Sequence, residues 1–126
     1  MNVVDSSGWI EYLVNSPNAE FFKPAIEDAE RLVVPTISVA EVFRWVFREA
    51  GKTDALQVTA LMQEGHVVGL DVPLAMRAAS MGFTLKLPLA DSVIFATARA
   101  YGATLWTQDA HFENIAGVQY RPKRRS

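Results

Sequence analysis

Short apolar runs alternate with longer stretches of helical periodicity from one end of the chain to the other. The predicted strands are residues 2–5, 31–34, 66–71 and 103–107, with a weaker strand at 118–120. The stretches between them carry apolar residues three and four positions apart, as a helix with one buried face requires. Apolar strands that alternate with helices predict a mostly parallel sheet covered on both faces, which is an α/β fold.

Six helices are predicted from their start and stop signals. Ser6 or Ser7 can cap the first, Ser38 opens the third and Thr53 caps the fourth, while the fifth ends near Gly82. The sixth is apolar almost all round, which predicts a buried central helix rather than a surface helix. The predicted helices cover approximately residues 6–16, 21–29, 38–51, 53–65, 73–82 and 90–101.

The composition predicts a single globular domain over residues 1–126, because 50% of the residues are hydrophobic and 21% are charged. The absence of cysteine excludes disulfides and thiolate metal sites. The chain begins without the pattern of a signal peptide and has no apolar run near the ~20 residues of a membrane span. We therefore expect a soluble, cytoplasmic protein without a membrane partner. A basic segment at 121–126 predicts a mobile tail.

Four acidic residues stand where an apolar segment stops or a helix begins: Asp5, Glu41, Asp91 and Asp109. In parallel sheets, ligands bind beyond the carboxyl ends of the strands, so we expect these side chains to converge at one edge. Clustered carboxylates are the ligands of hard divalent cations such as Mg²⁺, and a cation open to solvent favours phosphate chemistry.

Each acid also has a purely structural interpretation. Asp5 can cap the first helix, Asp91 can complement a helix dipole and Asp109 can cap a short turn. Glu41 completes the capping-box pattern that begins at Ser38. Two of the acids resist this interpretation, because Asp5 follows a buried strand and Asp91 opens a buried helix. A buried carboxylate needs a cation, and no Lys or Arg is close to either in sequence.

Taken together and in order, these motifs resemble the PIN domain, and within it the VapC-type toxins of toxin–antitoxin pairs. The resemblance covers essentially the whole chain. It rests on Asp5-Ser6-Ser7, on Glu41 at a helix start, on Leu87-Pro88-Leu89-Ala90-Asp91 before an alanine-rich helix, and on Thr107-Gln108-Asp109 followed by Phe112.

The resemblance implies a three-layer α/β/α sandwich, Mg²⁺- or Mn²⁺-dependent endoribonuclease activity, inhibition by a cognate antitoxin and a homodimer. It assigns Asp5 and Asp91 as the principal metal ligands, with Glu41 and Asp109 completing the catalytic cluster and Thr107 orienting it. The chain departs from the family pattern two residues after Asp109. Many relatives carry a further acid there, whereas this chain has His111, which we expect to be a surface turn residue.

Basic and hydroxyl side chains near the acids offer supporting contacts. Arg44 and Arg48 can share a helix face with Glu41 and contact an RNA phosphate, although an ion pair with Glu41 or Glu49 is an alternative. Ser6 can hydrogen-bond a ligand carboxylate as well as cap its helix. The aromatic-rich helix segment 43–47 supports the homodimer.

The net charge of −2 permits an RNA substrate without requiring one. Setting the four candidate ligands aside leaves ten acids against twelve Lys and Arg. Two other functions remain open: a different Mg²⁺-dependent phosphohydrolase, or a module that binds RNA or a protein without cleaving. The absence of a Gly-rich phosphate loop or Walker pattern disfavours the phosphohydrolase.

Overall fold

The computed structural model describes residues 1–124, in which two sets of parallel strands lie side by side. One set has the order β1-β4-β5 and the other pairs β2 with β3. A parallel bridge between Asn2 and Leu32 joins the two sets. The predicted parallel sheet is therefore confirmed. The strands are β1 (Asn2–Val4), β2 (Val33–Pro35), β3 (His66–Val68), β4 (Thr104–Thr107) and β5 (Val118–Tyr120).

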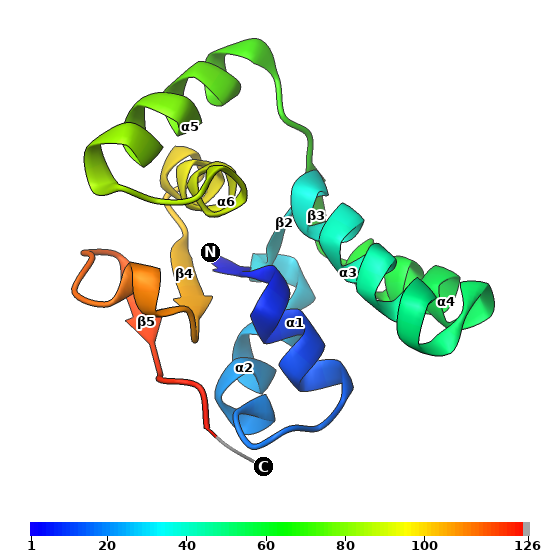
Figure 1. Cartoon of the computed structure of the whole chain (residues 1–126). Coiled ribbons are helices and arrows are strands. Elements are labelled where there is room, and N and C mark those ends of the chain that lie inside the picture. The colour runs from blue at the N-terminus through cyan, green and yellow to red at the C-terminus, as the bar shows by residue number, and fades with distance from the viewer. Residues whose placement is uncertain (125–126) are drawn as a thin grey trace.

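Alternate residues of the central strands point to opposite faces of the sheet, and helices cover both faces (Figure 1). Val4 and Val34 face one hydrophobic cluster, which contains Trp9 and Phe22. The preceding residues, Val3 and Val33, face a second cluster with Ile94, Phe95 and Phe112. The protein has the predicted three-layer α/β/α architecture.

The helices pair with their neighbours in sequence (Figure 1). The third and fourth form a hairpin beside the sheet, and the fifth packs on the sixth. Every residue from Ser92 to Ala98 is buried, which confirms the sixth as the central helix. The helices are α1 (Ser6–Leu13), α2 (Ala19–Ile26), α3 (Thr36–Ala50), α4 (Lys52–Met62), α5 (Val72–Leu85) and α6 (Leu89–Ala100), with short 3₁₀ turns η1 (Ala29–Arg31) and η2 (Ala110–Phe112).

Of the caps considered for the first helix, Asp5 is confirmed and Ser6 and Ser7 are not, and the predicted start of the third helix at Ser38 was wrong. Asp5, rather than Ser6 or Ser7, caps α1 and accepts a hydrogen bond from the Gly8 amide at 2.8 Å. The third helix starts directly after the extended Pro35, so Ser38 lies inside it with a buried hydroxyl that has no partner among residues 1–124. No capping box forms there, which removes the structural interpretation of Glu41.

Two other helix boundaries also differ from the prediction. The fourth helix begins at Lys52, so Thr53 lies inside it and Gly51, rather than Thr53, occupies the cap position. Glycine suits this tight connection because φ is 92° there. Gly82 does not end α5, which continues to Leu85. Instead, Gly82 allows α5 and α6 to approach closely, since a Cβ at this position would overlap the hydroxyl of Ser92.

The start of the basic C-terminal segment contacts the rest of the protein. The Arg121 amide donates to the Thr107 carbonyl at 3.1 Å, and its guanidinium lies 4.9 Å from the centre of the Phe21 ring. The Pro122 carbonyl accepts a hydrogen bond from Asn18 at 2.9 Å. The first two residues of the predicted mobile tail are thus attached, while positions 125–126 lie outside the described residues. Within residues 1–124, no helix has both the length and the apolar character needed to cross a membrane.

Candidate functional site

The pairing of β1 with β4 brings Asp5 next to Thr107 at the carboxyl edge of the sheet. Val4 is in register with Trp106, so the residues that follow are neighbours. The Thr107 hydroxyl donates to Asp5 Oδ2 at 2.5 Å and accepts a hydrogen bond from the Asp109 amide at 2.9 Å. Asp5 Oδ1 accepts from the Ser7 hydroxyl at 3.0 Å. Thr107 therefore holds Asp5 and Asp109 in a fixed relation.

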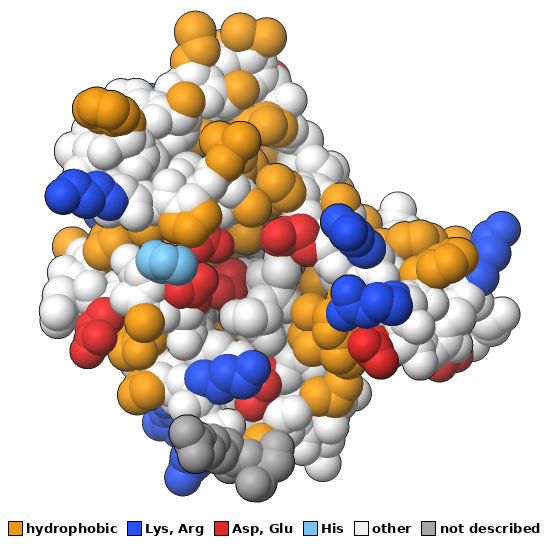
Figure 2. Space-filling view, viewed as in Figure 1, with side chains coloured by type: hydrophobic (Ala, Val, Ile, Leu, Met, Phe, Trp, Pro, Cys, Tyr) orange, Lys and Arg blue, Asp and Glu red, His pale blue; other side chains and the backbone are white. Residues whose placement is uncertain are grey.

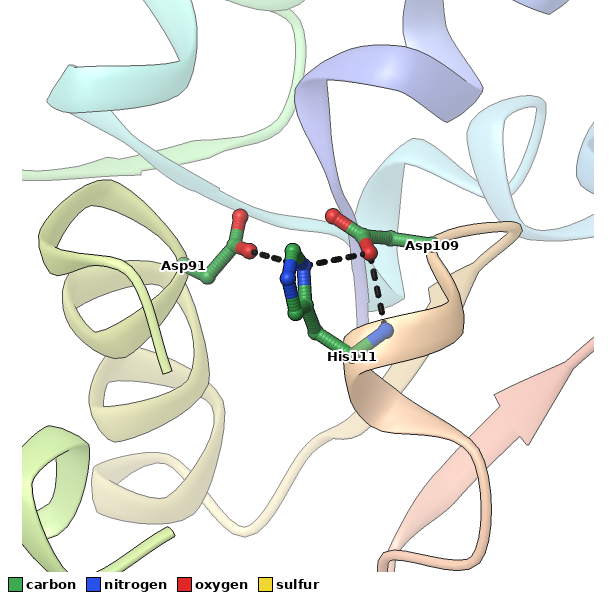
Figure 3. Close-up of side chains that lie close together, drawn as sticks. All are labelled: Asp91, Asp109 and His111. Atoms are coloured by element: carbon green, nitrogen blue, oxygen red, sulfur yellow. Dashed lines mark hydrogen bonds and ion pairs between the residues drawn. The ribbon is translucent and has the colours of Figure 1, made fainter. Parts of the chain in front are cut away.

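Two further segments add Asp91 and His111 to this edge. Asp91 lies in the first turn of α6 and His111 lies in η2. The Nδ1 atom of His111 is 2.8 Å from Asp109 Oδ1 and 3.5 Å from Asp91 Oδ2 (Figure 3). One potential ligand atom from each of these three residues lies within 4.8 Å of the other two. The group has the size of a metal-binding site.

Burial and neighbouring carboxylates make Asp5 and Asp91 hard to ionise. Asp5 is only 4% exposed, and its burial raises its pKa to about 6, although the Thr107 hydrogen bond acts in the opposite direction. Burial and the nearby Asp109 and Asp5 carboxylates raise the pKa of Asp91 to about 7. His111 acts in the opposite direction and partly lowers this pKa. No Lys or Arg within residues 1–124 forms an ion pair with Asp5, Asp91 or Asp109.

The residues present fit a hard divalent cation. Carboxylate oxygens are the ligands that Mg²⁺ and Mn²⁺ prefer, and an imidazole is also acceptable to Mn²⁺. Asp91, Asp109 and His111 present their donor atoms to a common space, and the buried Asp5 stands next to Asp109 through Thr107. A cation would favour the ionised forms of Asp5 and Asp91, whose pKa values are raised by burial and by neighbouring carboxylates.

Glu41 lies beside this group rather than within it. It is exposed on α3 and accepts a hydrogen bond from the Ser6 hydroxyl at 2.6 Å. The structure thus brings Asp5, Asp91 and Asp109 together and connects Glu41 to them through the Ser6-Ser7 turn. Glu41 shares a shallow cleft with Ser6, Ser7, Ile10, Arg44, Trp45 and Arg48.

Basic side chains surround the acidic group on this face of the molecule (Figure 2). Arg48 pairs with Glu49 at 3.3 Å, one of the two ion pairs considered from the sequence. Arg44 forms no ion pair within residues 1–124, so its guanidinium is available to a ligand in the cleft. Acidic side chains occupy the centre of the face in Figure 2, with Lys or Arg side chains on more than one side.

Some polar contacts of the site have no adequate signal in the sequence. His111 is 55% exposed, as a turn residue should be, yet its imidazole faces two carboxylates. Its position two residues after Asp109, in a short turn, was the available signal. A buried group formed by Glu11, Asn18 and Gln108 was not predicted, because its members are far apart in the chain and match no motif.

Solved structures with this fold include several from toxin–antitoxin systems. A chain of a toxin–antitoxin complex from Klebsiella pneumoniae superposes with a TM-score of 0.81 at 18% identity, covering 94% of this chain and 96% of that one. The sarcin–ricin-loop-cleaving toxin VapC20 of Mycobacterium tuberculosis gives 0.77 at 17% identity, with coverage of 97% and 100%. FitAcB from Neisseria gonorrhoeae gives 0.69 at 22% identity, with coverage of 95% and 96%.

The similarity in sequence is confined to a broad family. No curated protein matches the chain significantly. The family model for the PIN domain, however, matches residues 3–118, which include each of the four acids and Thr107. This match confirms the resemblance found in the motifs, and the structures of the toxin–antitoxin proteins agree with it in fold. The chain therefore belongs to the PIN domain family.

Proposed function

We propose that the protein is a metal-dependent endoribonuclease that acts as the toxin of a toxin–antitoxin pair. The observation that carries the proposal is the convergence of Asp5, Asp91 and Asp109 at one sheet edge with no Lys or Arg ion pair within residues 1–124. Two findings support RNA as the substrate: the protein belongs to the PIN family, and its fold is similar to that of a toxin that cleaves the sarcin–ricin loop.

Each residue of the site has a distinct part in this proposal. Asp5 and Asp91 would be the principal ligands of Mg²⁺ or Mn²⁺, and Asp109, with His111 beside it, would complete the group. When bound, such a cation supplies Lewis-acid activation of a phosphate oxygen and of water. The Thr107 hydroxyl keeps Asp5 oriented, and the exposed Glu41 carboxylate would accept a proton from water at the rim.

The cleft beside the acids suits an RNA backbone. Arg44 and Arg48 line it together with the hydroxyls of Ser6 and Ser7, which are common phosphate-contacting groups. Arg121 directly follows β5, which pairs with β4, and the Arg121 amide donates to the Thr107 carbonyl. We propose that these guanidinium groups attract the phosphates that flank the scissile bond.

Incubation with total RNA tests the activity. We expect discrete fragments with Mn²⁺ and none with EDTA. In Asp5→Asn the cleavage rate should fall by at least about 100-fold, because losing a residue of the metal site should reduce activity at least as much as losing a residue that only contacts a metal ligand. Asparagine is as good a helix cap as aspartate, so the variant should keep α1 intact. Asp54→Asn, at an exposed acid in α4, is the matched control.

The same experiment separates the competing functions. Retardation of RNA without fragments would indicate a binding module. Mn²⁺-dependent release of phosphate from a small phosphomonoester, with RNA left intact, would indicate a phosphohydrolase. Fragments that persist in Asp5→Asn at the wild-type rate would show that another group, or a contaminant, cleaves the RNA.

We further propose a small cognate antitoxin as the protein partner, and the cytoplasm as the place where both act. The support is the fold shared with chains of toxin–antitoxin complexes, one of which was crystallised as VapBC2 of Rickettsia felis on a promoter DNA fragment. An antitoxin gene is expected next to the gene for this protein. Co-purification of its product, with loss of RNA cleavage on binding, would test the pairing.

A homodimer is the third partner proposal, and the exposed face of α5 supports it. Val72, Met76 and Phe83 are 70%, 64% and 88% exposed, and with the exposed Ala79 they fall within about 60° of the helix circumference. Their spacing is symmetric, so two antiparallel copies would place Val72 against Phe83 and Met76 against Ala79. Asp71 at one end of α5 and Lys86 at the other would then approach across the interface.

Light scattering of the purified protein tests this interface. We expect a dimer for the wild type and a monomer for Phe83→Glu. The matched variant is Phe47→Glu in α3, a residue 50% exposed within the aromatic segment considered from the sequence. A dimer that survives Phe83→Glu and dissociates in Phe47→Glu would move the interface to α3.

A further inference from the structure

A buried polar network joins four separate segments directly behind the acidic site. Glu11 of α1 accepts hydrogen bonds from the Asn18 amide at 3.1 Å and from Gln108 Nε2 at 3.3 Å. Asn18 Nδ2 in turn donates to Gln108 Oε1 at 3.1 Å and to the Pro122 carbonyl at 2.9 Å. Glu11, Asn18 and Gln108 are 5%, 0% and 7% exposed.

The network is unusual because it contains a buried carboxylate without a basic partner. Within residues 1–124, Glu11 forms no ion pair, and its two oxygens accept hydrogen bonds from amide groups only. A buried acid of this kind is costly, so its donors must be held in place for the fold to keep it. Asn18 contributes both its backbone amide and its Nδ2 group to the network, while its buried Oδ1 has no hydrogen-bond partner within residues 1–124.

The network is connected to the candidate metal site through three consecutive residues. Thr107 directs its hydroxyl to Asp5, and Asp109 directs its carboxylate toward His111. Gln108 lies between them and points the other way, to Glu11 and Asn18. This alternation continues that of β4, so a movement of the Gln108 side chain would displace Thr107 and Asp109 together.

We propose that Glu11, Asn18 and Gln108 are positioning residues that fix the 107–109 segment in its metal-binding geometry, and that the C-terminal segment takes part through the Pro122 carbonyl. The proposal rests on the proposed metal site. In this proposal the C-terminal segment acts through the hydrogen bond from Asn18 to the Pro122 carbonyl, in addition to any attraction of its basic side chains for phosphate. Loss of that hydrogen bond would make the 107–109 segment more mobile even if every acidic and basic residue were kept.

Two truncations separate the hydrogen bond from the charge. A chain that ends at Pro122 keeps the acceptor for Asn18, whereas a chain that ends at Arg121 loses it. Both lack Lys123, Arg124 and Arg125. A point variant, Gln108→Ala, breaks the network at the site itself, and Gln63→Ala, at an exposed position after α4, is its control.

The first readout is hydrogen exchange of residues 105–113 in the metal-free protein. We expect the amides of Asp109, His111 and Phe112 to exchange about tenfold faster in Gln108→Ala and in the chain ending at Arg121, because their hydrogen bonds depend on the position of this segment. The chain ending at Pro122 and Gln63→Ala should exchange as the wild type does.

The second readout is Mn²⁺ affinity, measured by calorimetry on the same proteins. We expect it to fall about tenfold in the two network variants and to stay unchanged in the two controls. Unchanged exchange and unchanged affinity in Gln108→Ala would overturn the positioning role. A wild type that binds no Mn²⁺ would instead contradict the proposed metal site, while the exchange experiment would still report on the network. Equal losses in both truncations would assign the effect to the basic residues and overturn the role of Pro122.

Discussion

The acidic site places carboxylates where burial and mutual repulsion disfavour their charged forms. Asp5 and Asp91 come from different segments, and both have raised pKa values because they are buried near other carboxylates. Hydrogen bonds from Thr107, Gly8 and Ser7 oppose this effect at Asp5 without cancelling it. Such an arrangement costs stability in the absence of a cation, and the cost depends on pH.

The metal-free protein should lose stability as pH rises from about 4 to about 7. In the unfolded chain Asp5 loses its proton near pH 3.8, whereas in the fold it keeps it up to about pH 6. The folded state therefore binds more protons in this window, and the difference between 3.8 and about 6 corresponds to about 3 kcal/mol. Denaturant unfolding in EDTA across this pH range would measure it.

The control for this prediction is Asp5→Asn, which cannot ionise. Subtracting its unfolding free energy from that of the wild type at each pH removes the contribution of acids that do not interact with Asp5, and leaves that of Asp5 together with its effect on Asp91. The unfolding free energy of the wild type should fall relative to that of Asp5→Asn as pH rises. A difference that stays constant between pH 4 and pH 7 would show that Asp5 is not destabilised by its surroundings.

Thr107→Val tests the hydroxyl that joins two of the acids. The variant preserves the shape of the side chain but removes the donor to Asp5 and the acceptor for the Asp109 amide. We expect a loss of about 1–3 kcal/mol in the free energy of unfolding and about tenfold weaker Mn²⁺ binding. Thr107→Ser, which keeps the hydroxyl, should restore most of the Mn²⁺ affinity. If serine and valine behave alike, the hydroxyl does not orient the site.

At the scale of helices and strands, the sequence predicted which elements form more accurately than where they begin. The apolar runs located all five strands, and the uniformly apolar α6 is the buried helix. The helix starts were less accurate because several residues compete for each cap. Ser6 and Ser7 are good caps in isolation, but the strand ends one residue earlier and Asp5 takes the position.

Gly82 shows the same limit at a contact between two helices. Glycine after an apolar stretch indicates a helix end, yet here it allows α5 to pack against Ser92. Sequence periodicity does not reveal such a contact, because it depends on the neighbouring helix. The helix therefore continues until Lys86, which ends it in the left-handed conformation.

Gly82→Ala should consequently destabilise the protein, although alanine normally favours helices. The added methyl group would overlap the Ser92 side chain and push α5 away from α6, at a cost of about 1–3 kcal/mol. Gly102→Ala is an unsuitable control because of its positive φ, so Ser80→Ala, at an exposed position in α5, serves instead. Thermal unfolding would compare them, and a Gly82→Ala protein as stable as Ser80→Ala would contradict the close contact.

For the molecule as a whole, the sequence predicted the site better than its surroundings. The pairing of β1 with β4 brings Asp5 and Asp109 to one edge of the sheet, and the first turn of α6 adds Asp91. Glu41 lies beside these acids rather than among them. It is exposed in the second turn of α3, which begins two residues before its predicted start at Ser38. The roles of these acids in metal binding stay predictions.

The polar groups behind the site could not be predicted in the same way. The network of Glu11, Asn18 and Gln108 depends on the distances between α1, β4 and the C-terminal segment. Nothing in the local sequence fixes these distances, since they result from the packing of the whole domain. Such contacts determine how rigid the acidic site is, while the acids determine its chemistry.

A calorimetric titration with Mn²⁺ at pH 8, above the raised pKa values of Asp5 and Asp91, tests the divalent cation site most directly. We expect the wild type and Asp54→Asn to bind Mn²⁺ equally, and Asp91→Asn to bind it at least about 100-fold more weakly, because its carboxylate faces both Asp109 and His111. Equal affinity in all three proteins, or no binding to the wild type, would contradict a divalent cation site at the carboxyl edge of the sheet.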